Sequence, residues 1–127
     1  MGNRVIFSRK NLKGFYTFYK VGGVFNVDAL GTMLIDGVGG FEGKLILNTA
    51  GVVTSIPYAG HYELSQDGTG EFNWLRKFAD GGEELMHSHF VVLAHQAEIV
   101  TSLYSSFDHA DGKTGEVNAR MLVRISD

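Results

Sequence analysis

Two histidines separated by one residue, His87 and His89, are the most distinctive chemical feature of the sequence. On an extended strand, alternate residues project from the same face, so the two imidazoles would lie side by side. Such a pair can bind a metal ion, act as an acid or base on a bound molecule, or form ordinary structural hydrogen bonds. The histidines left to complete a metal site are His61, His95 and His109. Because His95 and His109 fall near expected turns, we predict no metal site and keep the two other interpretations.

Aromatic side chains are the second group that could form a site. The chain has nine Phe, five Tyr and one Trp, many of which must belong to the core. Tyrosine and tryptophan combine an apolar body with one hydrogen bond, and an arginine that pointed inward would orient an acidic group. The candidate catalytic residues are His87, His89 and Tyr104, and the candidate ligand-binding residues are Tyr16, Tyr62, Trp74, Arg76 and Arg120.

Other familiar signatures are broken or absent. Gly37, Gly39 and Gly43 resemble a phosphate-binding loop, but the following residues 44–47 have strand character, so no helix N-terminus is expected to hold a pyrophosphate. No serine lies in the G-x-S-x-G pattern of a hydrolase, and the chain has no cysteine. We therefore expect no cofactor.

Charge and hydropathy limit the partners. The formal net charge is −3, and basic residues form no cluster of the kind that nucleic-acid binding needs. No apolar run is long enough to span a membrane, and residues 1–10 lack the apolar stretch of a secretory signal. We expect a cytoplasmic protein whose partner is a small-molecule ligand or substrate, with neither nucleic acid nor a membrane as partner, and we leave a homodimer open.

Turn signals divide the chain into short strands. Asp-Gly pairs supply the positive φ angles that hairpin turns need, and four occur: Asp36-Gly37, Asp67-Gly68, Asp80-Gly81 and Asp111-Gly112. Segments of strand character cover residues 15–21, 30–35, 41–47, 58–64, 71–78, 85–94, 98–107 and 117–125. Their regular spacing predicts an antiparallel meander without crossover helices.

Two segments carry competing patterns. Apolar residues at steps of three and four between Met86 and Tyr104 would also suit a helix, but the β-branched and aromatic content favours a hairpin that turns near His95 and Gln96. In the last segment, Val117, Ala119, Met121, Val123 and Ile125 alternate with Asn118, Arg120 and Arg124, and Leu122 is the apolar exception. This alternation predicts that the valine-containing face packs in the core and that Asn118, Arg120 and Arg124 point the other way.

Eight strands in a chain of 127 residues suit one domain that covers the whole chain. Closing the sheet would remove its exposed edges. The predicted fold is therefore all-β, a single antiparallel up-and-down β-barrel of about eight strands. Glycines and alanines within strands, such as Gly43, Gly60 and Ala119, are expected to leave room inside it.

Three motifs carry a family resemblance: L-K-G-x-Y-x-F beginning at Leu12, with Phe15 and Tyr16 at its centre, G-T-x-x-x-D-G-x-G beginning at Gly31, and G-x-Y-x-x-x-x-D-G-T-G beginning at Gly60. They resemble a family of small bacterial lipocalin-like β-barrel proteins, over most of the chain. The resemblance implies a barrel of calycin or allene oxide cyclase-like shape with an apolar interior, and it supplies no catalytic residue. Related cofactor-free barrels that close rings are an analogy of fold only.

Two functions follow as hypotheses. The first is a module that encloses a small apolar or amphipathic molecule. The second is a cofactor-free cyclase or isomerase that holds a polyketide- or terpenoid-like substrate of secondary metabolism, with a histidine or tyrosine as proton donor. A barrel filled by its own side chains, serving as a structural domain, is the third option.

Overall fold

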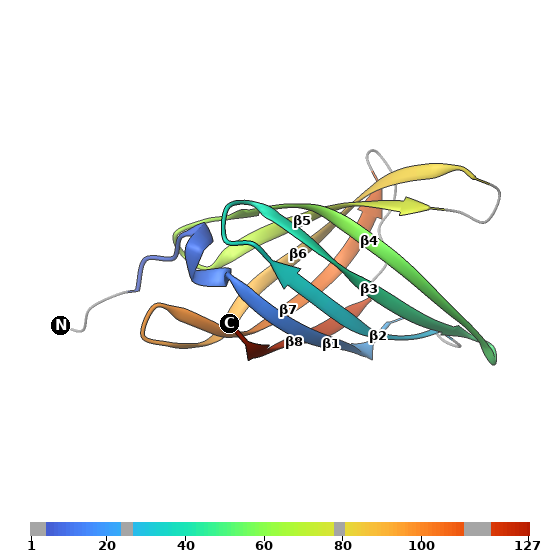
Figure 1. Ribbon diagram of the computed structural model, residues 1–127, viewed down its shortest axis with the longest axis horizontal. Helices are drawn as coiled ribbons and strands as arrows, with labels where there is room; N and C mark the ends of the chain where they lie inside the picture. Colours follow the sequence, from blue (N-terminus) through green and yellow to red (C-terminus); the bar gives the residue numbers. More distant parts are fainter. Residues whose placement is uncertain (1–4, 24–26, 78–80, 111–117) are drawn as a thin grey trace.

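Eight antiparallel strands form one closed barrel (Figure 1). The computed structural model describes residues 5–23, 27–77, 81–110 and 118–127. The strands are β1 (Gly14–Gly22), β2 (Val27–Ile35), β3 (Gly40–Thr49), β4 (Val52–Leu64), β5 (Thr69–Lys77), β6 (Glu83–Gln96), β7 (Ile99–Ala110) and β8 (Ala119–Ser126). Each strand pairs with the next in the chain, and β8 pairs with β1 to close the sheet. The prediction of an all-β up-and-down barrel is confirmed.

The segment with a competing helical pattern forms β6 and β7. Gln96 pairs with Ile99, so the hairpin turns on Ala97 and Glu98 beside the predicted position. The helical alternative was wrong because each strand satisfies its backbone hydrogen bonds with two neighbours in the closed sheet. None of the described residues forms a helix that is long and apolar enough to cross a membrane.

Two of the predicted Asp-Gly turns are confirmed. Asp36 Oδ1 accepts hydrogen bonds from the amides of Val38 (2.8 Å) and Gly40 (2.9 Å), and these bonds lower the pKa of Asp36. Asp67 Oδ1 accepts from the amide of Thr69 at 3.0 Å. The turns at Asp80-Gly81 and Asp111-Gly112 involve residues outside the described ranges.

A short 3-10 helix, η1 (Arg9–Leu12), lies at the end of the barrel where β2 turns into β3 (Figure 1). Leu12 has no exposed surface, and the Tyr16 hydroxyl donates a hydrogen bond to its carbonyl at 2.8 Å. Arg124 of β8 points into the same region, where its Nε donates to the Val100 carbonyl at 2.6 Å and its Nη2 to the Tyr16 hydroxyl at 2.9 Å. We call this region the closed end of the barrel.

Glycines on the inner face lie under aromatic rings of the paired strand. A Cβ atom at Gly31 would come within 2.7 Å of Cζ of Phe18, its partner in the register, and Gly60 has the same relation to Phe41. Because the ring of the neighbouring strand occupies the space that a side chain would take, these glycines do not enlarge the interior. The prediction that Gly60 leaves room was wrong, and its effect is to let an aromatic ring lie flat against the wall.

From Arg120 onward, strand β8 faces the opposite way from the prediction, whereas Ala119 is buried as predicted. Leu122, the apolar exception in the pattern, is 1% exposed and belongs to the core, whereas Ile125 is 55% exposed. Arg120 and Arg124 point inward. Their charges are accommodated because each finds hydrogen-bond acceptors inside the barrel, so apolar character alone does not decide which face of this strand is buried.

Candidate functional site

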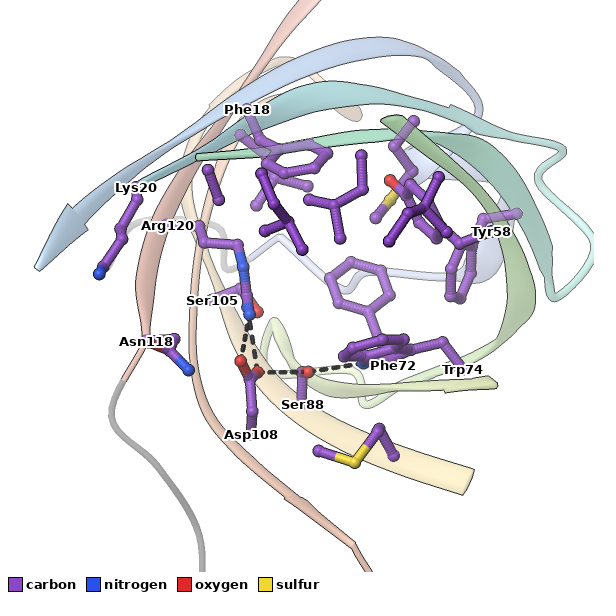
Figure 2. Close-up of a pocket in the computed structure, with 18 of the residues that line it drawn as sticks. Phe18, Lys20, Tyr58, Phe72, Trp74, Ser88, Ser105, Asp108, Asn118 and Arg120 are labelled. Atoms are coloured by element: carbon purple, nitrogen blue, oxygen red, sulfur yellow. Dashed lines mark hydrogen bonds and ion pairs between the residues drawn. The ribbon is translucent and has the colours of Figure 1, made fainter. Parts of the chain in front are cut away.

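A cavity of about 410 Å³ occupies the barrel (Figure 2). Residues from all eight strands line it. Most of its wall is apolar: Phe18, Ala29, Met33, Phe41, Leu45, Leu47, Ile56, Tyr58, Phe72, Trp74, Leu75, Met86 and Leu122. Polar side chains gather on one side of it, formed by β1, β6, β7 and the start of β8: Lys20, Ser88, Ser105, Asp108, Asn118 and Arg120. The interior is therefore divided into an aromatic and aliphatic body and one polar side.

A chain of hydrogen bonds organises the polar side. Trp74 Nε1 donates to Ser88 Oγ at 2.9 Å, and Ser88 Oγ donates to Asp108 Oδ1 at 2.6 Å. Arg120 Nη1 donates to the same Oδ1 at 3.0 Å, and Nη2 donates to Oδ2, so the guanidinium and the carboxylate form a bidentate ion pair (Figure 2). Asp108 is only 4% exposed, and a buried carboxylate requires such a partner. We call Trp74, Ser88, Asp108 and Arg120 the polar relay.

A β-bulge in β7 turns Asp108 toward the cavity. His87 pairs with His109 and His89 pairs with Ser106, so two steps along β6 correspond to three along β7. The bulge includes Phe107, which has a φ of +60° and is 58% exposed. With regular alternation from the buried Leu103, Phe107 would point inward and Asp108 outward. The extra residue of the bulge reverses these two directions, so that Asp108 points inward. The positive φ of Phe107 is unfavourable for a bulky residue.

Ser105 is the polar group of the cavity that lacks a partner. Its Oγ is buried and makes no hydrogen bond among the residues that the structure describes, although the residue lines the cavity. In the register of β7 and β8 it lies opposite Arg120. An unpaired buried hydroxyl is unfavourable, and Ser105 lies beside the open volume of the cavity.

Tyr58 forms part of the wall and is poorly suited to donate a proton to a ligand. Its hydroxyl donates to the Thr32 carbonyl at 2.7 Å, and burial raises its pKa above the ordinary range for tyrosine. The ring also packs edge-on against Phe18. Its role is therefore apolar contact.

Two of the five predicted ligand-binding residues, Trp74 and Arg120, line the cavity. Tyr16 and Tyr62 belong instead to the closed end, where their hydroxyls donate to the backbone carbonyls of Leu12 (2.8 Å) and Arg9 (3.1 Å). Neither tyrosine lines the cavity, because η1 supplies the acceptors for both hydroxyls. The side chain of Arg76 lies outside the described part of the chain.

The three candidate catalytic residues do not line the cavity. His87 Nδ1 lies 2.5 Å from Asn73 Oδ1 and 3.1 Å from Glu71 Oε1, on the opposite face of β6 from Ser88. His89 Nε2 lies 3.0 Å from His109 Nε2. Tyr104 is on the outward face of β7, between the inward Leu103 and Ser105. Alternation therefore places the histidine pair on the outer face of the barrel, away from a molecule enclosed in the cavity.

Metal binding was one of the three interpretations of His87 and His89. Within residues 5–23, 27–77, 81–110 and 118–127, no group of three or more histidine, aspartate and glutamate side chains is arranged to hold a metal ion. His87 and His89 instead take part in side-chain contacts with Glu71, Asn73 and His109.

Sequence reasoning missed Ser88, Ser105 and Asp108. The sequence places Ser88 on the opposite face of its strand from His87 and His89, but it does not say which face points inward. Asp108 had no signal, since nothing in the sequence around Phe107 indicates a bulge that lacks glycine.

Compared with known proteins, the chain matches no family model, no curated protein and no solved structure.

Proposed function

We propose that the protein binds a small amphipathic molecule inside the barrel. The observation that carries the proposal is the division of the 410 Å³ cavity into a broad apolar wall and one polar side with an unpartnered buried hydroxyl. The body of the ligand would pack against the rings of Phe18, Phe41 and Phe72. Its polar end would meet Arg120 and Ser105.

The size of the cavity supports a guest molecule. Protein interiors pack closely and leave few voids larger than one water. At about 30 Å³ for each water molecule, 410 Å³ corresponds to about 14 waters, and it falls within the range of about 300–1,000 Å³ that is typical of ligand sites. A largely apolar wall is a poor environment for that much water, so an apolar molecule fits it better.

A cyclase or isomerase has no comparable support. The acid and base groups assigned to it lie outside the barrel, and the hydroxyl of Tyr58 is committed to a backbone carbonyl. We therefore carry the binding function forward alone.

The test measures the binding of Nile red, an uncharged apolar dye. Two signals are read: the emission of the dye and the fluorescence of Trp74, the one tryptophan of the chain. The wild-type protein should bind the dye at one site, with blue-shifted dye emission and a change in Trp74 fluorescence. Ala29→Phe places a ring in the cavity and should weaken binding at least tenfold. Leu30→Phe, on the outward face of the same strand and half exposed, is the matched control and should bind as the wild type does.

Circular dichroism and thermal unfolding must show that both variants fold. Equal dye binding by Ala29→Phe and wild type would place the dye elsewhere and remove the basis of the proposal. Loss of binding in Ala29→Phe alone would support it.

A further inference from the structure

The charges of the polar relay are balanced before any ligand arrives. Arg120 and Asp108 are joined by two hydrogen bonds, and their side chains are 18% and 5% exposed, respectively. Ser88 supplies a further donor to the carboxylate. A cavity that was built for an acid would hold its arginine without a carboxylate partner, whereas here the protein supplies that carboxylate itself.

Hydrogen-bonding capacity remains after the charges are balanced. Ser105 is one of the residues that line the cavity, and its buried Oγ has no hydrogen-bond partner among the described residues. A guanidinium has five N–H donors, of which the bonds to Asp108 use two. Because Ser105 and Arg120 are opposite each other on β7 and β8, one oxygen atom of a guest can lie close to both.

We propose that the polar end of the ligand is an uncharged oxygen, a hydroxyl or a carbonyl, that accepts a hydrogen bond from Arg120 and pairs with Ser105, and that the cavity disfavours carboxylates. This inference rests on the proposed binding function. An uncharged oxygen forms these hydrogen bonds without adding charge. A carboxylate in the same place would be a second anion beside buried Asp108, and one guanidinium cannot neutralise both in an interior of low dielectric constant.

Lys20 is the second cation on the cavity wall, and it lies opposite Arg120 in the pairing of β1 with β8. It already has an interaction of its own. Removing the charge of Asp108 while Lys20 is unchanged tests whether Asp108 decides which head group is accepted.

The probes are 1-dodecanol and dodecanoate, which share one chain length and differ in the head group. Each displaces Nile red at pH 7.5, and calorimetry confirms the affinities. In the wild type, dodecanol should bind at least tenfold more tightly than dodecanoate. In Asp108→Asn, the affinity for dodecanoate should rise at least tenfold, because Arg120 then carries an unneutralised charge. The affinity for dodecanol should change less than threefold.

The serines provide a pair of variants that are expected to fold. Ser105 and Ser106 are both buried with unpartnered hydroxyls, but only Ser105 lines the cavity. Ser105→Ala and Ser106→Ala should both unfold at the wild-type temperature or higher, because each removes an unsatisfied polar atom. Only Ser105→Ala should weaken the binding of dodecanol. The expected loss of affinity is about fivefold, which corresponds to one ordinary hydrogen bond.

The outcomes separate the two proposals. Tighter binding of dodecanoate than of dodecanol by the wild type would overturn the inference and leave the binding function intact. Unchanged dodecanol affinity in Ser105→Ala would also overturn it. If neither probe nor Nile red binds to the wild type, the proposed function itself fails.

Discussion

Two arginines on the inner face of β8, four residues apart, serve opposite purposes. Arg124, at the closed end, donates to the Val100 carbonyl and the Tyr16 hydroxyl, and its guanidinium lies 5.1 Å from the centre of the Tyr16 ring. Arg120 forms an ion pair with Asp108 beside the cavity.

The difference lies in the acceptors and in the free volume beside them. Around Arg124 the buried acceptors are uncharged, the one carboxylate partner is the exposed Asp127 at 3.7 Å, and the fully buried Leu12 and Tyr16 fill the space. Around Arg120 the acceptor is a carboxylate, and open volume adjoins the pair. The same residue type on the same face of one strand thus seals one end of the barrel and forms a polar site in its cavity.

The largest effect is expected from Arg120→Met. It leaves the carboxylate of Asp108 buried without its partner, which should lower the free energy of unfolding by about 3–5 kcal/mol. Adding Asp108→Leu removes the stranded charge and should recover most of that loss. Urea unfolding followed by circular dichroism measures both. A double variant no more stable than the single variant would show that the ion pair is not what holds this region.

A smaller effect is expected from Arg124→Met at the closed end. The substitution removes the short hydrogen bond to the Val100 carbonyl, which keeps only the 3.4 Å bond from the Tyr16 hydroxyl, and we expect a loss of about 2–3 kcal/mol in the free energy of unfolding. Nile red affinity should stay within twofold of the wild type, because Arg124 does not line the cavity. A tenfold weaker dye affinity in a folded Arg124→Met variant would mean that the two ends are coupled.

The smallest effect is a pH dependence of the closed end. Burial raises the pKa of Tyr16 to about 12, against the opposing charge of Arg124, whereas its value in the unfolded chain is 10.0. Because the folded-state pKa is the higher one, the contribution is complete below pH 10 and is lost as the pH rises through about 12. Urea unfolding between pH 8 and pH 11 should therefore show falling stability, with a shallower fall in Tyr16→Phe. Identical slopes in the two proteins would contradict the assignment to Tyr16.

The local patterns that predicted the fold are those that favour one backbone conformation in almost any surroundings. An Asp-Gly pair such as Asp36-Gly37 makes a tight turn in almost any surroundings, because glycine accepts positive φ and the aspartate bonds nearby amides. Alternation along each strand then predicts a sheet, and the number of strands predicts its closure. Trp74 and Arg120, two candidates chosen for their residue type, line the cavity.

The residues that were misplaced depend on neighbours far away in the chain. Tyr16 is removed from the cavity by η1 and Arg124, and the latter lies 108 positions away. His87 and His89 are outside because their strand presents Ser88 to the barrel, where Trp74 and Asp108 bond to it.

By itself, the sequence determined the strands, the turns that fall on described residues and the closed antiparallel sheet, since backbone geometry and alternation act over a few residues. Only the tertiary structure decided which face of β8 is buried and which polar groups meet inside. One added residue at the bulge near Phe107 reverses the direction of every side chain after it, and this brings Asp108 to Arg120. The cost of burying a charge depends on its partner, and that partner is known only once the strands are assembled.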